Sequence, residues 1–141
     1  MSRIFWDSML LIYLLEDNPA FSNRADEILA RARRRGDKLF TSCLALGEVV
    51  TGAEKPSSGR KEPAIRMAIG EMGFHFLPFD EGAVTPFALL RTRTKVKIAD
   101  AIHLACAASA GIDLFLTGDK QLTKLDVPGI QFIVDFTSPV Y

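Results

Sequence analysis

The sequence has no net charge, few cysteines and no long apolar run, and each shortage excludes a class of protein. Its 17 basic and 17 acidic side chains cancel over 141 residues, so the summed charge exerts no long-range attraction on RNA or DNA. Cys43 and Cys106 have neither the spacing of a zinc site nor the density of a disulfide scaffold, which favours a reducing cytoplasm. The apolar run Met9–Leu15 is too short to span a bilayer and lacks a cleavage site, so we expect no membrane contact.

What is present is the composition of one globular domain over residues 1–141. With 48% hydrophobic and 24% charged residues, the chain can bury a sizeable core. Apolar runs alternate with segments of helical periodicity. Ser42 and Asp80 are expected helix caps, and Pro86 is expected to kink or restart its helix. The expected strands are 4–6, 38–41, 74–79, 112–116 and 130–136, and the expected helices are 8–16, 18–35, 43–53, 63–72, 81–94 and 98–110.

This alternation predicts an α/β fold of three layers, with a parallel sheet of about five strands between helices. Two helices separate the third and fourth strands, which is enough chain to cross from one flank of the sheet to the other. We therefore expect the strand order 3-2-1-4-5. The first and fourth strands are then neighbours, and ligands of open α/β folds bind beyond the carboxyl ends of such a pair.

Four carboxylates converge on this edge of the predicted sheet. Asp7 ends the first strand, and Asp119 lies just past the fourth. Asp100 is in the first turn of a helix that begins at the same edge. Glu48 is more than a turn into its helix, but helical side chains lean toward the N-terminus and a Glu is long enough to reach the rim.

Each acid also has a structural explanation. Asp7 and Asp119 are suitable helix caps, and Asp100 is a favourable charge at a helix N-terminus. Glu48 is harder to explain in this way, because its apolar neighbours leave little solvated face and an unpaired buried carboxylate is costly. His103 lies one turn after Asp100 in an apolar helix, where a structural role is the expectation.

Four acids at one rim repel each other unless a cation neutralises them. Carboxylate oxygens select hard ions, so Mg²⁺ or Mn²⁺ is expected rather than zinc. Such a site commonly serves phosphoryl chemistry, of which phosphodiester hydrolysis is the simplest case. The residues after Asp7 are Ser8 and Met9, which excludes both the adjacent acids of a phospho-receiver and the Asp-x-Asp of haloacid-type phosphatases.

Four segments together resemble the PIN-domain nucleases, in particular the VapC-like toxin ribonucleases of toxin–antitoxin pairs. They are FWDS at 5–8, the Glu of LGEVV at 46–50, IADAIHLACA at 98–107 and LTGDKQL at 116–122. The resemblance implies an Mg²⁺- or Mn²⁺-dependent endoribonuclease with Asp7, Glu48, Asp100 and Asp119 as its catalytic site.

The resemblance also implies roles for individual residues. Asp7 and Asp100 would be direct metal ligands, Asp119 would bind the ion directly or through water, and Glu48 would bind the ion or position the nucleophilic water. Ser8 and Thr117 would orient a carboxylate or a bound water. The chain departs from the family at Leu122, where an aromatic residue is common, and at Pro86; both changes concern packing.

Partners follow from the charges and from the resemblance. Arg91, Arg93, Lys95 and Lys97 precede Asp100 and are the preferred candidates for RNA contact; the basic stretch 31–38 is better explained as a solvated helix end. The VapC resemblance implies a cognate antitoxin and a toxin homodimer, with the apolar helices at 9–15 and around Phe21 as a candidate groove. The alternatives are a PIN nuclease of RNA maturation without an antitoxin, and a catalytically inactive protein-binding module.

Overall fold

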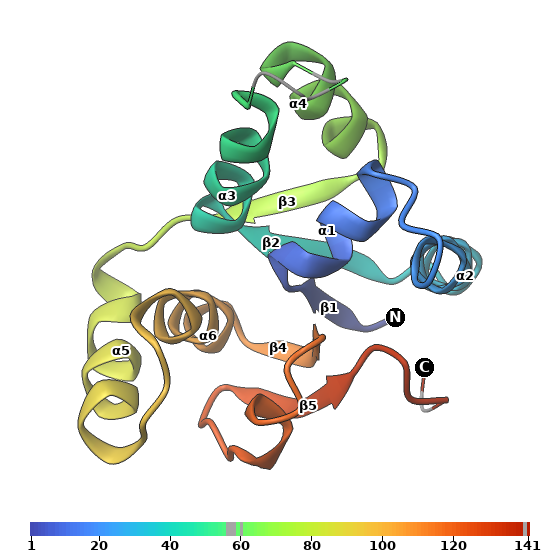
Figure 1. The fold of residues 1–141 in the computed structure, drawn as a ribbon. Coiled ribbons are helices and arrows are strands. Elements are labelled where there is room, and N and C mark those ends of the chain that lie inside the picture. Colours follow the sequence, from blue (N-terminus) through green and yellow to red (C-terminus); the bar gives the residue numbers. More distant parts are fainter. Residues whose placement is uncertain (56–58, 60, 140) are drawn as a thin grey trace.

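The computed structural model describes residues 1–55, 59, 61–139 and 141. These residues form a parallel sheet with helices on both faces (Figure 1). In chain order the elements are β1 (Arg3–Trp6), α1 (Ser8–Leu15), α2 (Ser22–Arg35), β2 (Lys38–Ser42), α3 (Cys43–Ala53), α4 (Glu62–Glu71), β3 (Phe74–Leu77), α5 (Glu81–Arg93), α6 (Ile98–Ala110), β4 (Ile112–Thr117), the short 3₁₀ helix η1 (Leu122–Lys124) and β5 (Ile130–Asp135).

The strand order β3-β2-β1-β4-β5 confirms the predicted topology. All four neighbouring pairs are parallel, and β1 pairs with β4 through Phe5 opposite Phe115 and Trp6 opposite Leu116. The Asp7 amide then donates to the carbonyl of Leu116 at 3.0 Å, so the two central strands end side by side. Residues that follow β1 and β4 therefore meet at one edge of the sheet.

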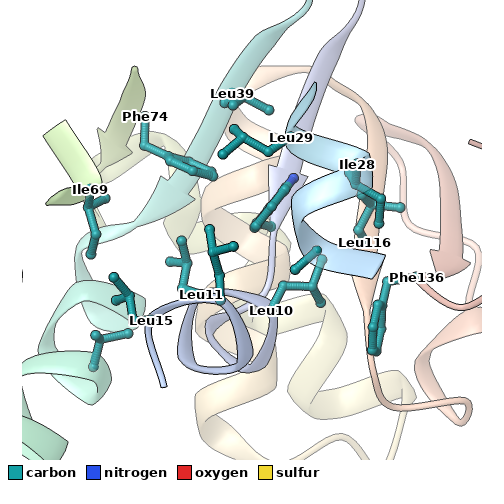
Figure 2. Packing of buried hydrophobic residues seen from close by; sticks show 14 of the residues in the cluster. Leu10, Leu11, Leu15, Ile28, Leu29, Leu39, Ile69, Phe74, Leu116 and Phe136 are labelled. Carbon is teal, nitrogen blue, oxygen red and sulfur yellow. The ribbon is translucent and has the colours of Figure 1, made fainter. Parts of the chain in front are cut away.

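Two apolar cores lie on opposite faces of this sheet. The first is built by α1–α4 and contains leucines of α1 together with Ile28, Leu116 and Phe136 (Figure 2). The second lies under α5 and α6, where Phe5 stacks on Phe115 with ring centroids 4.7 Å apart. Leu122 is buried in this second core, so it fills an apolar space without an aromatic ring.

Trp6 is the one tryptophan of the sequence and is fully buried in the first core. Its ring meets Phe74 of β3 edge to face, with centroids 5.2 Å apart. Its carbonyl accepts a 2.9 Å hydrogen bond from the buried Thr41 hydroxyl. These contacts fix the residue immediately before Asp7.

Several predicted boundaries and caps can be compared with the structure. Ser42 and Asp80 cap α3 and α5, as predicted. The predicted start of the second helix at Asn18 is wrong: the Asn18 side chain accepts the amides of Ala20 and Phe21 in a turn, and α2 begins at Ser22. Asn competes for backbone donors in this way because its side chain is short and polar.

Near β3 and α5, the predicted end of the strand at Phe79 and the predicted restart of the helix at Pro86 are wrong. Phe79 does not extend the third strand, which ends at Leu77; the exposed Phe79 ring instead packs edge to face on Phe87 of α5 at 5.4 Å. Pro86 does not restart α5, which is continuous from Glu81 to Arg93. A proline removes one backbone donor, and in the second turn of α5 this loss leaves the helix intact.

Among the described residues, no helix combines the length and the apolar character that crossing a membrane requires.

Candidate active site at the carboxyl edge of the sheet

Asp7 is held in place by the ends of both central strands. It is the N-cap of α1 and is 6% exposed. Its Oδ1 accepts the Ser8 amide at 2.7 Å, and its Oδ2 accepts the Thr117 hydroxyl at 2.9 Å. The Ser8 hydroxyl lies 3.4 Å from Oδ1. The expected helix cap is confirmed, and both carboxylate oxygens of Asp7 are held by hydrogen bonds.

Thr117 connects Asp7 to Asp119. The buried Thr117 hydroxyl donates to Asp7 and accepts the Asp119 amide at 3.0 Å. Asp119 itself is exposed, and its Oδ1 accepts the Gln121 amide at 2.9 Å in the turn that leads to η1. A single hydroxyl at the end of β4 thus sets the relative position of two acids.

Asp100 is the acid with the most perturbed electrostatic environment. It lies half-buried in the first turn of α6. Burial raises the pKa of its carboxyl above the ordinary value, and the negative charges of Asp7, Asp119 and Glu48 raise that pKa further, against an opposing effect of His103. The four acids are therefore close enough for their charges to interact.

Glu48 is more exposed than its apolar neighbours predict. Its side chain is 38% exposed, and its Oε1 lies 2.7 Å from Nε2 of His103. His103 is 2% exposed, and its Nδ1 lies 2.7 Å from the Ser42 hydroxyl. The expected structural environment of His103 is present, yet one of its two partners is a site carboxylate. The sequence signal was the spacing of one helical turn from Asp100, which places His103 on the same face.

The four acids line one open pocket of about 510 Å³. Ser8 and His103 line it too, as do Lys97 and Lys120. Lys120 was not singled out in the sequence, although its place directly after Asp119 is a usable signal. The lining of the pocket therefore combines four carboxylates with two lysine side chains.

The basic residues before Asp100 separate into different places. Lys95 and Lys97 line a second pocket, of about 350 Å³, that also contains Asp100 and Asp119. Arg91 donates to the carbonyl of Val96 at 2.7 Å and so supports the loop that carries both lysines. Arg93 lines another groove beside Pro86. The structure brings the two lysines to the acids, and it places the arginines elsewhere.

The donor set suits a hard divalent cation, since every candidate ligand is a carboxylate oxygen. Within the described part of the chain, no group of three His, Cys, Asp or Glu side chains has the arrangement of a ready-made metal site.

Without a divalent ion, Asp100→Asn is expected to stabilise the fold at neutral pH. The folded-state pKa of Asp100 is raised above the ordinary value of 3.8, so folding favours the protonated carboxyl. The stability that this protonated form contributes is complete below pH 3.8 and is lost as the pH rises through the folded-state pKa. The gain should be on the order of 1 kcal/mol or less, since water screens a half-exposed charge. Urea unfolding in chelator at pH 7 and near pH 4 measures it; the difference should shrink at the lower pH. An equally or less stable variant at pH 7 would contradict the assigned repulsion.

The structure defines the class of protein: a three-layer α/β fold with an acidic pocket beyond the carboxyl ends of its central strands. The family comparison matches residues 4–128 to the PIN domain. The chain therefore belongs to the PIN-domain family, a family of nucleases. No curated protein sequence matches the chain significantly.

Solved structures with this fold include several toxin–antitoxin complexes. The DNA-bound VapBC of Salmonella typhimurium superposes with a TM-score of 0.70 at 22% identity, over 96% of this chain and 99% of that one. VapBC2 of Rickettsia felis, bound to a promoter DNA fragment, gives 0.69 at 16% identity over 94% and 98%. A toxin–antitoxin complex of Klebsiella pneumoniae gives 0.66 at 23% identity over 90% and 94%. At these identities the likeness concerns the fold.

Proposed function

We propose that this protein is a metal-dependent endoribonuclease that uses Mg²⁺ or Mn²⁺ and acts as the toxin of a VapBC-type pair. The observation that carries the proposal is the convergence of Asp7, Glu48, Asp100 and Asp119 on one pocket, where burial and then the charges of the other three acids raise the pKa of Asp100. Such an arrangement is unfavourable in isolation and becomes favourable when a cation is bound. Membership of the PIN-domain family supports the nuclease assignment.

In this proposal Asp7, Asp100 and Asp119 hold the ion, with Asp119 binding directly or through water. A bound divalent ion would polarise the scissile phosphate and lower the pKa of a water molecule. Thr117 and Ser8 keep the Asp7 oxygens oriented. Glu48 positions the attacking water through the carboxylate oxygen that His103 does not engage.

RNA is the proposed substrate, and the lysines around the pocket are its proposed phosphate contacts. Lys97 lies in the same pocket as the acids, and Lys95 lies in the adjoining one. Lysine binds phosphate as a point charge without reading the base. Arg91 contributes indirectly by holding the loop of both lysines, and Arg93 is the least suited of the four predicted contacts because it lines a different groove.

A cleavage assay on purified protein tests the proposal. The protein, freed of any antitoxin, is incubated with total RNA in Mg²⁺ or Mn²⁺, with and without chelator. We expect cleavage in the presence of metal and none in chelator, with activity restored when metal is added back. Intact RNA with both metals, from protein shown to be folded by circular dichroism, would refute the nuclease assignment and favour a binding module.

An antitoxin is the proposed protein partner, supported by the toxin–antitoxin complexes among the structural neighbours. A groove of about 730 Å³ runs between α1 and α3, is lined by Ile12, Leu15 and Val49, and reaches Glu48. Phe21, a predicted groove residue, instead packs on Tyr13 and Phe136, with ring centroids 4.8 and 5.4 Å apart. We therefore place the antitoxin segment between α1 and α3, and we retain a homodimer and a cytoplasmic location as parts of the proposal.

A further inference from the structure

Three side chains from different elements form a continuous hydrogen-bonded chain that ends in the acid pocket. Ser42, at the end of β2, lies 2.7 Å from Nδ1 of His103 in α6, and Nε2 of the same ring lies 2.7 Å from Oε1 of Glu48 in α3. Ser42 and His103 are both buried, whereas Glu48 is partly exposed at the pocket. The chain thus connects the interior of the protein to one carboxylate of the site.

Hydrogen-bonding capacity fixes the direction of the contact between His103 and Glu48. An ionised carboxylate only accepts, so Nε2 of His103 must carry a proton and donate it to Glu48. The Ser42 oxygen already accepts the Ala45 amide at 2.9 Å as the cap of α3, and its own proton can then be donated to Nδ1. A neutral ring protonated on Nε2 satisfies both contacts. Phe5, whose ring centroid is 6.4 Å from that of His103, packs beside the imidazole.

From this geometry we propose that His103 is a positioning residue for Glu48: Ser42 orients the imidazole, and the Nε2–H of the imidazole holds the Glu48 carboxylate at the pocket. The inference rests on the nuclease function proposed above and deepens it by assigning a role to a buried residue. A glutamate in the second turn of a helix has three rotatable side-chain bonds, and a donor on a second helix removes much of that freedom.

The matched variants His103→Asn and His103→Gln separate positioning from packing. The Asn side chain reaches Ser42, as Nδ1 does, but is too short to reach Glu48. The Gln side chain places an N–H donor close to the position of Nε2 and keeps the contact with Glu48. If His103 acts by positioning, His103→Asn should lower kcat of RNA cleavage by about 10- to 100-fold with KM little changed, because a side chain that is 2% exposed offers little surface to RNA. His103→Gln should retain most of the wild-type kcat.

A purely structural His103 predicts a different result. Both variants would then lose activity together, in proportion to the loss of folded protein seen by circular dichroism. Equal losses in Asn and Gln, or a change confined to KM, would overturn the inference. If wild-type protein cleaves no RNA, the proposed nuclease function fails, and that outcome is separate from a difference between the two variants.

A spectroscopic measurement on the wild-type protein tests the same inference without any variant. Long-range ¹⁵N–¹H correlation spectra at one neutral pH report which ring nitrogen carries a proton. We expect a proton on Nε2 of His103, and Glu48→Gln should shift that nitrogen because its acceptor becomes an uncharged amide. An unprotonated Nε2 would overturn the inference, since the ring could not then donate to the carboxylate.

Discussion

Asp100→Asn is expected to reduce metal-dependent RNA cleavage by more than about 100-fold. Removing a group that only supports a metal ligand typically costs about 10- to 100-fold in activity, and Asp100 is proposed to contact the ion itself. The variant keeps the size of the side chain and removes one negative charge from the pocket where the four acids meet. Initial rates at saturating Mg²⁺ or Mn²⁺, together with metal titrations by calorimetry, measure the effect.

Asp26→Asn is the matched control for this experiment. It makes the same chemical change on an exposed position of α2, so it should leave both the rate and the metal affinity unchanged. Cleavage by Asp100→Asn at a rate close to that of wild type would remove Asp100 from the proposed site. Circular dichroism of both proteins in the assay buffer with metal separates a loss of rate from a loss of folded protein.

Gly129→Ala is expected to destabilise the fold by about 2 to 5 kcal/mol. Gly129 has a φ of +100°, and a Cβ built on it would lie 2.5 Å from the carbonyl oxygen of Ala108. A residue with a Cβ in the left-handed region costs about 1–2 kcal/mol, and forcing extra volume into a packed site costs about 1–3 kcal/mol. The neighbour is backbone at the end of α6, so it cannot turn aside as a flexible side chain would. Urea unfolding followed by circular dichroism measures the loss.

Gly70→Ala provides the comparison. Gly70 is helical, has a negative φ and has nothing within 4 Å of the position of a new Cβ. The same substitution should therefore be neutral or stabilise by up to about 1 kcal/mol. If Gly129→Ala were tolerated as well as Gly70→Ala, the close approach between Gly129 and α6 would be wrong. Gly129 precedes β5 and lies away from the acids, so the folded fraction of the variant should retain its metal dependence.

The sheet could be predicted from the sequence because its determinants are local. Buried parallel strands read as apolar runs, and two helices between the third and fourth strands imply a crossing of the sheet. The errors lie where a short-range competitor decides the outcome. Asn18 takes backbone donors into a turn, and Phe79 packs on α5 after the strand has ended. Pro86 shows the reverse case, because the loss of one backbone donor in the second turn does not interrupt α5.

The acids could be placed at one edge for the same reason, since the ends of neighbouring strands must meet. The spacing of residues in the sequence does not reveal the hydrogen-bond partners of each carboxylate, and the structure does. The contact of His103 with Glu48 joins α6 to α3, and it depends on how two helices sit on the sheet. The same holds for Lys97 and Arg93, which are four positions apart in the chain and line different pockets.

The burial of Trp6 directly before Asp7 has a practical consequence for optical measurements. Because the sequence contains one tryptophan, all indole emission comes from the end of β1, where the ring is shielded from water and packed on Phe74. The protein thus contains an intrinsic fluorophore one residue from a proposed metal ligand. Its emission wavelength and quenching by added solutes report the integrity of this strand end, and no dye or label has to be introduced near the pocket.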